Sequence, residues 1–317
     1  MAGFLAAFCH NQRMAARSKF GKDTGLQVRM VFTMFLLGLV YVVLVGALIA
    51  AGTAAVTIAI IAGLLLLIQL FASDKIALAT LGARQVSVDE APQLHAIIER
   101  LCVQADLPKP KVYVMNTQMP NAFAMGRSPK SASVCATTGL LRMLDPHELE
   151  AVLGHEVTHI VNRDVMVMTL ASFFATLAAM VAQFALFFGG GFGGGYGRNR
   201  EQEAGIAMVM LVSILVYAIS FLLLRALSRY REFAADRGSA VLTGRPSALA
   251  SALIKVTGTI ERIPSQDMRR AEGMSAFFIV PARAKKSLMN IFSDHPPLEK
   301  RLQALSRLEA QLQGTSS

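Results

Sequence analysis

The sequence predicts an α-helical integral membrane protein with four transmembrane helices and a cytoplasmic domain of mixed α and β structure. Of the 317 residues, 54% are hydrophobic and only 16% are charged, whereas soluble domains are about 25% charged. Four long runs contain no charged residue, and a bilayer core requires roughly 20 apolar residues per helix. The runs are 31–50, 54–71, 165–188 and 206–224.

Basic residues flank these runs unevenly and predict their orientation. Arg and Lys residues precede the first run, against a lone Asp23, and more basic residues follow the second and fourth runs. The connection 189–203 is glycine-rich and charge-balanced, which is typical of a flexible loop on the opposite side. Because cytoplasmic flanks carry the excess of Lys and Arg, we expect a multi-pass protein with both termini in the cytoplasm.

The apolar runs divide the chain into five segments. The net charge of +10 fits cytoplasmic membrane flanks, and without an aromatic-basic motif we expect no nucleic-acid partner. The expected segments are 1–30, a basic cytoplasmic N-terminal extension; 31–71, a hairpin of two spans; 72–164, the first part of the cytoplasmic domain; 165–224, spans three and four with the glycine-rich loop 189–203; and 225–317, the second part of the cytoplasmic domain.

The segment 72–164 predicts helices and short strands. Glu90–Gln104 places four apolar residues on one helical face, and "KVYVM" (111–115), "PNAFAMG" (120–126) and "SASVCATT" (131–138) are typical of extended chain. A second helix should begin at Pro146, with Asp145 as its N-cap and Glu148 completing a capping box. The three cysteines, Cys9, Cys102 and Cys135, lack C-x-x-C spacing, so we interpret them as buried or inert thiols.

The segment HEVTH (155–159) lies in this second helix. Residues four apart share one helical face, about 6 Å apart, so His155 and His159 could bind one metal ion. Glu156 is then placed to take a proton from a water molecule that attacks a carbonyl. Chance produces this pattern in on the order of one in 200 such chains, from residue frequencies. The alternative is a surface helix with two solvated histidines.

A catalytic zinc site needs a third protein ligand. The segment 227–242 is helical by pattern and places Glu232 and Asp236 one turn apart. Glu232 could be the third ligand, and Asp236 could accept the free ring N–H of a ligating histidine. At 1.5 Å per residue, His159 and Glu232 both lie roughly 10 Å from the neighbouring apolar runs, on the same side of the membrane. The alternatives are Glu201 and Glu203, on the wrong side, and Glu261 and Glu272, without a comparable partner.

Four motifs, "PNAFAMG", "GHEVTHIVNRD", "REFAAD" and "FSDHPPLEKR", follow one another in this order. On these motifs, residues 28–305 resemble the HtpX group of membrane zinc endopeptidases, which are relatives of the CAAX prenyl-protein proteases. The resemblance implies a gluzincin-type zinc-protease domain with one Zn²⁺ per chain. Its implied ligands are His155, His159 and Glu232, with Glu156 as the general base.

The resemblance also implies a role in membrane-protein quality control. The protein would lie in the bacterial inner membrane and cut misfolded or damaged membrane proteins from the cytoplasmic side. Its expected partners are therefore these substrates, the lipid bilayer and other quality-control proteins.

Further site residues follow from the resemblance. "NAFAMG" resembles the family's substrate-facing edge strand, where a peptide would pair through its backbone; from the residues alone it is a short extended piece. His295 and Arg301 are expected either to approach the substrate carbonyl as oxyanion donors or to brace the acidic residues, although His295 could equally be a helix-start residue without chemistry. The substrate-binding candidates are Asn121, Ala122, Phe123 and Ala124.

Three other functions are weaker. A transporter or channel would place ionisable residues inside its spans, and the four runs contain none. A CAAX-type protease would have more spans. A zinc-binding but proteolytically inactive scaffold has no use for Glu156 as a base, although the sequence alone leaves it open.

Overall fold

The structure is a computed structural model, and it describes residues 24–50, 64, 68, 78–184, 200–260, 262 and 295–314. The chain forms two compact units. The sheet unit takes residues 1–27, 74–166 and 229–317, and the helical unit takes residues 28–73 and 167–228. The N-terminal extension to residue 23, nearly all of the expected second span, residues 185–199 and residues 263–294 lie outside the description, and Cys9, Glu261 and Glu272 with them.

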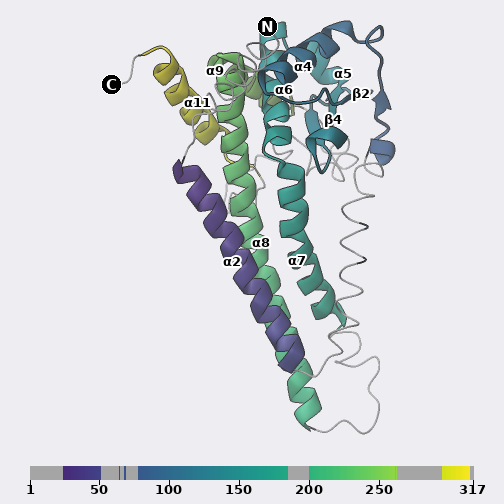
Figure 1. Cartoon of the computed structure of the whole chain (residues 1–317), viewed down its shortest axis with the longest axis vertical. Coiled ribbons are helices and arrows are strands. Elements are labelled where there is room, and N and C mark those ends of the chain that lie inside the picture. Colours follow the sequence, from purple (N-terminus) through teal and green to yellow (C-terminus); the bar gives the residue numbers. More distant parts are fainter. Residues whose placement is uncertain are drawn as a thin grey trace, which may run out of the picture. The chain divides into compact units, whose positions relative to one another are not determined.

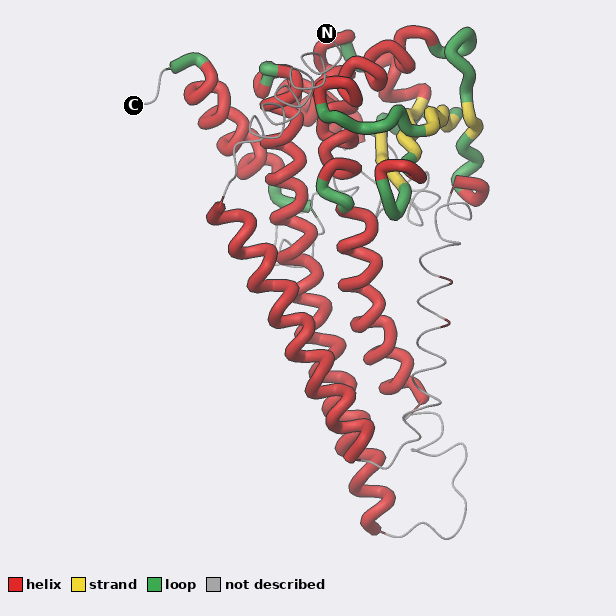
Figure 2. Tube along the Cα trace, viewed as in Figure 1, coloured by secondary structure: helices red, strands yellow, loops and turns green. Residues whose placement is uncertain are grey.

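Strands are confined to a short part of the sheet unit, and the other elements are helical (Figure 2). In chain order the elements, most of which are labelled in Figure 1, are α2 (Thr24–Ala50), β1 (Arg84–Gln85), α4 (Pro92–Gln104), β2 (Lys111–Met115), β3 (Ala122–Met125), η1 (Pro129–Ser131), β4 (Ser133–Thr137), α5 (Thr138–Met143), α6 (Pro146–Val161), α7 (Asp164–Phe184), α8 (Arg200–Thr243), α9 (Pro246–Ile260) and α11 (Leu298–Leu312).

The helical unit is built from α2, α7 and the first part of α8. Leu37, Ala171 and Leu227 form one buried contact among the three helices, and Leu44 packs with Ala178 and Val209 in another. Large apolar side chains on α2 and α8 also point outward, such as Phe35 and Leu211. An apolar outer surface of this kind is expected where lipid is the solvent.

Two described helices are long and apolar enough to cross a membrane by length and composition. They contain Val28–Gly46 and Ala207–Thr243, and a third span results if α6 and α7 count together as one bent segment. The first and fourth expected spans therefore coincide with apolar helices. The third forms α7 as far as Phe184, and nearly all of the second lies outside the described residues. Four complete spans stay a prediction.

The sheet unit holds a four-stranded sheet with the order β1-β2-β4-β3. β2 and β4 run parallel, whereas β3 pairs antiparallel with β4 and forms one edge. The three predicted extended segments thus all form strands, and β2 has the predicted bounds. Because successive strand residues point to opposite faces, Ala122 joins the larger core, and Phe123 joins the smaller core on the other face.

The larger core joins the sheet to α4, α6 and α9. α4 carries the predicted apolar face, buried at Leu94, Ile97, Ile98 and Leu101. α9 packs against both α6 and α11 (Figure 1). Cys102 and Cys135 are buried, and burial raises their pKa values to about 11 and about 12. The burial of these two thiols is as predicted, and the raised pKa values keep the thiolate scarce near neutral pH.

α6 begins as the sequence predicts. The side chain of Asp145 accepts hydrogen bonds from the backbone N–H groups of His147 and Glu148, both at 2.9 Å. Glu148 accepts the N–H of Asp145 in return at 3.0 Å, so the capping box is complete. Lys255 of α9 donates to the buried Glu148 at 2.7 Å, which ties this helix start to its neighbour.

Small residues let α6 and α8 approach closely. Ser239 of α8 donates a hydrogen bond to the carbonyl of Ala151 at 2.6 Å. A Cβ atom on Gly238 would meet the side chain of Thr158 at 2.3 Å. Thr158 is fully buried, and its hydroxyl is committed to the carbonyl of Gly154 at 2.8 Å. The side chain therefore has no room to turn away.

We expect Gly238→Ala to lower the thermal unfolding temperature of the detergent-purified protein, because the added methyl group forces α6 and α8 apart. Overpacking of this kind costs about 1–3 kcal/mol. Gly258→Ala in α9 is the matched control, because its Cβ atom meets nothing within 4 Å. Alanine also favours a helix more than glycine does. Equal melting temperatures for the two variants would show that the close approach does not constrain the pair.

Candidate metal centre

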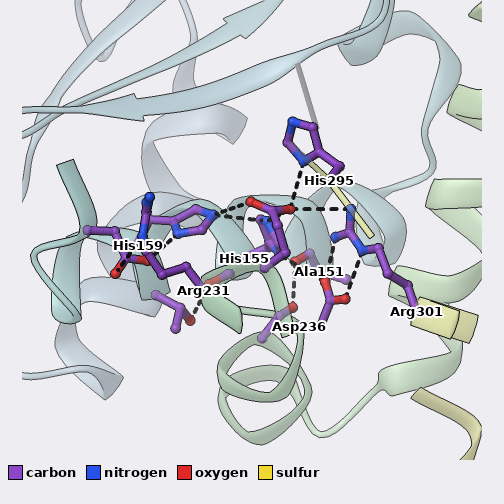
Figure 3. Close-up of polar contacts among 12 residues, drawn as sticks. Ala151, His155, His159, Arg231, Asp236, His295 and Arg301 are labelled. Atoms are coloured by element: carbon purple, nitrogen blue, oxygen red, sulfur yellow. Dashed lines mark hydrogen bonds and ion pairs between the residues drawn. The ribbon is translucent and has the colours of Figure 1, made fainter. Parts of the chain in front are cut away.

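Three side chains from two helices bring donor atoms to one point. His155 and His159 of α6 have their Nε2 atoms 3.1 Å apart. The carboxylate of Glu232 on α8 lies 3.6 Å from Nε2 of His155 and 3.5 Å from Nε2 of His159. Among the described residues these three form a group that could hold a metal ion. The structure thus brings together the three predicted ligands, and Figure 3 shows the two histidine rings side by side.

Each histidine presents its other nitrogen to a buried aspartate. Nδ1 of His155 lies 3.0 Å from Asp236 of α8, and Nδ1 of His159 lies 2.6 Å from Asp164 of α7. An aspartate at Nδ1 favours the ring tautomer with its proton on that atom. The two Nε2 atoms then carry lone pairs and face each other together with the oxygens of Glu232. Three electron-pair donors that converge in this way favour a cation among them.

The spacing and the charges both fit a divalent cation. Donors held tetrahedrally at about 2.0–2.1 Å from zinc are about 3.3–3.4 Å apart, close to the three separations of the ligand atoms. Burial lowers the pKa of His159, but Asp164 and Glu232 outweigh burial and raise it to about 10, so the surroundings favour positive charge. Four carboxylates against two guanidiniums, with neutral histidines, leave a formal charge of −2. These groups are Glu156, Asp164, Glu232, Asp236, Arg231 and Arg301.

Glu156 occupies the position next to the first histidine and is buried, with 4% of its surface exposed. Burial raises the pKa of its carboxyl group, and the neighbouring histidines offset this effect only in part. A base accepts a proton most effectively when its pKa lies near the working pH. The raised pKa of Glu156 therefore suits a group that takes up and releases one proton.

His295 and Arg301 both contact the acidic residues. Nδ1 of His295 lies 3.1 Å from Glu232. Arg301 of α11 donates to both oxygens of Asp236, at 2.8 and 2.5 Å, and its third nitrogen lies 3.5 Å from Glu232. Figure 3 shows both side chains reaching toward the histidine pair. Arg301 thus holds Asp236 in place, and the contact with Glu232 places His295 at the site, where the oxyanion role stays a prediction.

The four substrate-binding candidates differ in exposure. Asn121, Ala122 and Phe123 are buried, whereas Ala124 is half-buried. Thr137 donates its N–H to the carbonyl of Asn121, so the pair formed by these residues is of the hydrogen-bonded type. In an antiparallel ladder such pairs alternate. The backbone groups of Ala122 and Ala124 therefore point away from β4, toward the free edge of the sheet.

Sequence reasoning assigned no role to Asp164 and Arg231, although both contribute to the site. Asp164 closes the conspicuous motif "GHEVTHIVNRD", and Arg231 immediately precedes Glu232. The available signal was the presence of charged residues at the ends of both ligand segments. The side chains of the rejected alternatives Glu201 and Glu203, and all of Glu261 and Glu272, lie outside the description.

Comparison with known proteins places the chain in a family. Residues 89–309 match the sequence profile of Peptidase family M48. The chain is 52% identical over 296 residues to "Protease HtpX homolog 2" of Methanosarcina acetivorans, covering 93% of this chain and 99% of the relative. It is 52% identical over 297 residues to "Protease HtpX homolog" of Moorella thermoacetica, with 94% and 99% covered. It is 50% identical over 300 residues to "Protease HtpX homolog 1" of Streptomyces coelicolor, with 93% and 97% covered.

A solved structure shares the fold. The crystal structure of S. mikatae Ste24p superimposes with a TM-score of 0.52 at 19% sequence identity, covering 89% of this chain and 67% of that one. The sequence relatives span nearly the whole chain, and the matched residues 89–309 include the three residues whose donor atoms converge. The chain therefore belongs to peptidase family M48, as a membrane metalloprotease of the HtpX type.

Proposed function

We propose that this protein is a zinc-dependent endopeptidase of a bacterial inner membrane that hydrolyses misfolded or damaged membrane proteins at the cytoplasmic face. The observation that carries the proposal is the convergence of three donors, two buried and one largely buried, beside a buried glutamate, with an aspartate behind each histidine. Two histidines and one glutamate are a ligand set used by catalytic zinc sites, which leave one position open. A purely structural site has no need of Glu156.

The chemistry divides between the ion and the chain. A zinc ion held by His155, His159 and Glu232 would polarise the scissile carbonyl and lower the pKa of the attacking water. Glu156 would accept the proton of that water and deliver it to the leaving amine. His295 could steady developing negative charge on the carbonyl oxygen through Nε2, because Nδ1 faces Glu232. Arg301 would keep Asp236 ionised behind His155.

The edge of the sheet offers a binding mode for the substrate. Ala124 is the most exposed of the candidate residues, and its backbone groups point out of the β3 edge. The Ala124 N–H also lies within reach of Glu156, whose carboxylate it favours. A peptide that pairs with this edge in extended form would pass beside the general base. Folded proteins have few unpaired extended segments, which favours misfolded substrates.

We expect Glu156→Gln to bind one zinc per chain and to cleave an unfolded membrane protein roughly 100- to 10,000-fold more slowly than wild type, the range for loss of a general base. The amide is isosteric with the carboxyl group but cannot accept the proton. Protein stripped with a chelator and restored with zinc provides the assay, and bound metal is counted in every sample.

Glu150→Gln is the matched control for this variant. Glu150 lies on the same helix and is buried, but it pairs with Arg100 and Arg245 instead of facing the metal centre. Its activity should stay near that of wild type. Zinc binding by wild type without cleavage of any unfolded substrate would favour an inactive scaffold. Equal cleavage by wild type and Glu156→Gln would show that Glu156 is not the general base.

We expect Ala124→Pro to lower kcat/KM for an unfolded substrate roughly 2- to 10-fold, because it removes an outward N–H that lies at the substrate edge and beside Glu156, and a hydrogen bond contributes about 0.5–1.5 kcal/mol. Proline is tolerated at a sheet edge, so the melting temperature and zinc content should change little. Phe123→Pro is the contrasting variant, because Phe123 pairs inward with Cys135, and it should lower the melting temperature. Unchanged kcat/KM in Ala124→Pro would argue against pairing at this edge.

The proposed orientation can be measured in sealed membrane vesicles. With four spans and the metal centre in the cytoplasm, a C-terminal tag should be digested by added protease in inside-out vesicles and protected in right-side-out vesicles. We expect this orientation because Lys and Arg residues, which flank the apolar runs here, are enriched on the cytoplasmic side of membrane proteins. Digestion in right-side-out vesicles would reverse the proposed topology without affecting the metal chemistry.

A further inference from the structure

Asp164 is a buried acid that sequence reasoning passed over. It is the first residue of α7, and 1% of its surface is exposed. Its Oδ2 atom lies 2.6 Å from Nδ1 of His159. A contact this short to a charged acceptor is typical of strong, charge-assisted hydrogen bonds. Among the described side chains, Asp164 is therefore the hydrogen-bond partner of Nδ1 of His159, the ring nitrogen that points away from the other ligands.

The chain reaches this position through an unusual turn. α6 ends at Val161, and the N–H of Asn162 still bonds to the carbonyl of Thr158 at 3.0 Å. Arg163 follows with φ +56°, a left-handed conformation that residues other than glycine rarely adopt. This reversal brings Asp164 back toward His159, five residues earlier. The turn thus places an acid behind the second histidine at some cost in backbone strain.

The partly buried guanidinium of Arg231 holds Asp164 from the other side. Nε of Arg231 on α8 lies 3.1 Å from Oδ1 of Asp164, and 12% of the Arg231 side chain is exposed. Arg231 immediately precedes the expected ligand Glu232, so one turn of α8 supplies both a ligand and the partner of this acid. A buried ion pair is weak evidence for stability, because desolvation offsets its attraction. Its value here lies in keeping Asp164 ionised and fixed.

An equivalent set of contacts holds the first histidine, His155. His155 faces Asp236 at 3.0 Å, and Arg301 donates to both oxygens of Asp236. Each ligating imidazole is therefore backed by an aspartate, and each aspartate by an arginine. Both arrangements use α6 and α8, but the aspartate behind His159 comes from α7, and the arginine behind Asp236 comes from α11. Their common feature is the ring nitrogen that each one holds.

We propose that Asp164, held by Arg231, is a positioning residue that orients His159 and strengthens its bond to the metal ion. Because it acts through a metal ligand, this role rests on the proposed zinc site. An aspartate on Nδ1 keeps the proton there, leaves Nε2 free to bind metal and makes the ring more basic. Removal of such a partner typically weakens metal binding 10- to 100-fold.

The test measures zinc affinity and does not depend on cleavage. Wild type, Asp164→Ala and Asp164→Asn are purified in detergent, stripped of metal and titrated with zinc against a chromophoric chelator. The dissociation constant should rise 10- to 100-fold in Asp164→Ala. It should rise less in Asp164→Asn, which keeps an acceptor but loses the charge. The absorption spectrum of the cobalt-loaded protein should shift in both variants, because the geometry around His159 changes.

Asp145→Ala provides the matched control. It removes an aspartate from the opposite end of α6 and costs about 1 kcal/mol of stability through loss of the helix cap. Its zinc affinity should stay within twofold of wild type, which separates helix stability from ring orientation. Wild-type affinity and spectrum in both Asp164 variants would overturn the proposal. If Asp164→Ala does not fold, unchanged affinity and spectrum in Asp164→Asn alone would do so. Failure of wild type itself to bind zinc would instead remove the metal site on which the proposal rests.

Discussion

Three electron-pair donors that face one another inside a protein repel, and the centre of this molecule is arranged around that repulsion. The two Nε2 atoms and the carboxylate of Glu232 lie 3.1–3.6 Å apart, and the surrounding acids outnumber the bases by two. A divalent cation resolves both conditions. The aspartates, the arginines and the burial of Glu156 all act on the same position, the one between the three donor atoms. Each of them changes the electrostatic potential there.

The convergence also depends on how closely two helices can pack. His155 and His159 come from α6 and Glu232 from α8, so the distance between the donor atoms depends on the helix spacing less the reach of the side chains from each helix. Gly238 and Ser239 remove bulk where the helices meet, and the hydroxyl of Ser239 bonds to α6 directly. Gly238 and Ser239, which are not expected ligands, therefore determine whether the three expected ligands can converge. The sheet supports α6 from its other side, where β3 also presents its free edge.

Local rules were enough to predict much of this arrangement. The N-cap at Asp145, the i, i+4 histidines and the one-turn spacing of Glu232 and Asp236 depend on helix geometry, which the sequence displays directly. The role of Asp164 could not be predicted in the same way, because it requires a left-handed residue at Arg163, where glycine is the usual signal. The burial of Asn121, Ala122 and Phe123 likewise follows from sheet packing and not from their own residue types.

The balance of buried charge affects how much folded protein a cell contains. A cluster that is neutral with its ion has two excess negative charges without it, which its histidines can offset only by taking up protons, as the raised pKa of His159 indicates, and charges of this kind are costly in a protein interior. An ion that binds the native state and not the unfolded chain contributes about 4 kcal/mol at a thousand times its dissociation constant. Metal starvation would thus lower the amount of intact protein as well as its activity. Abundance would then report on the metal status of the cell, and newly made chains would gain their full stability only on acquiring the ion.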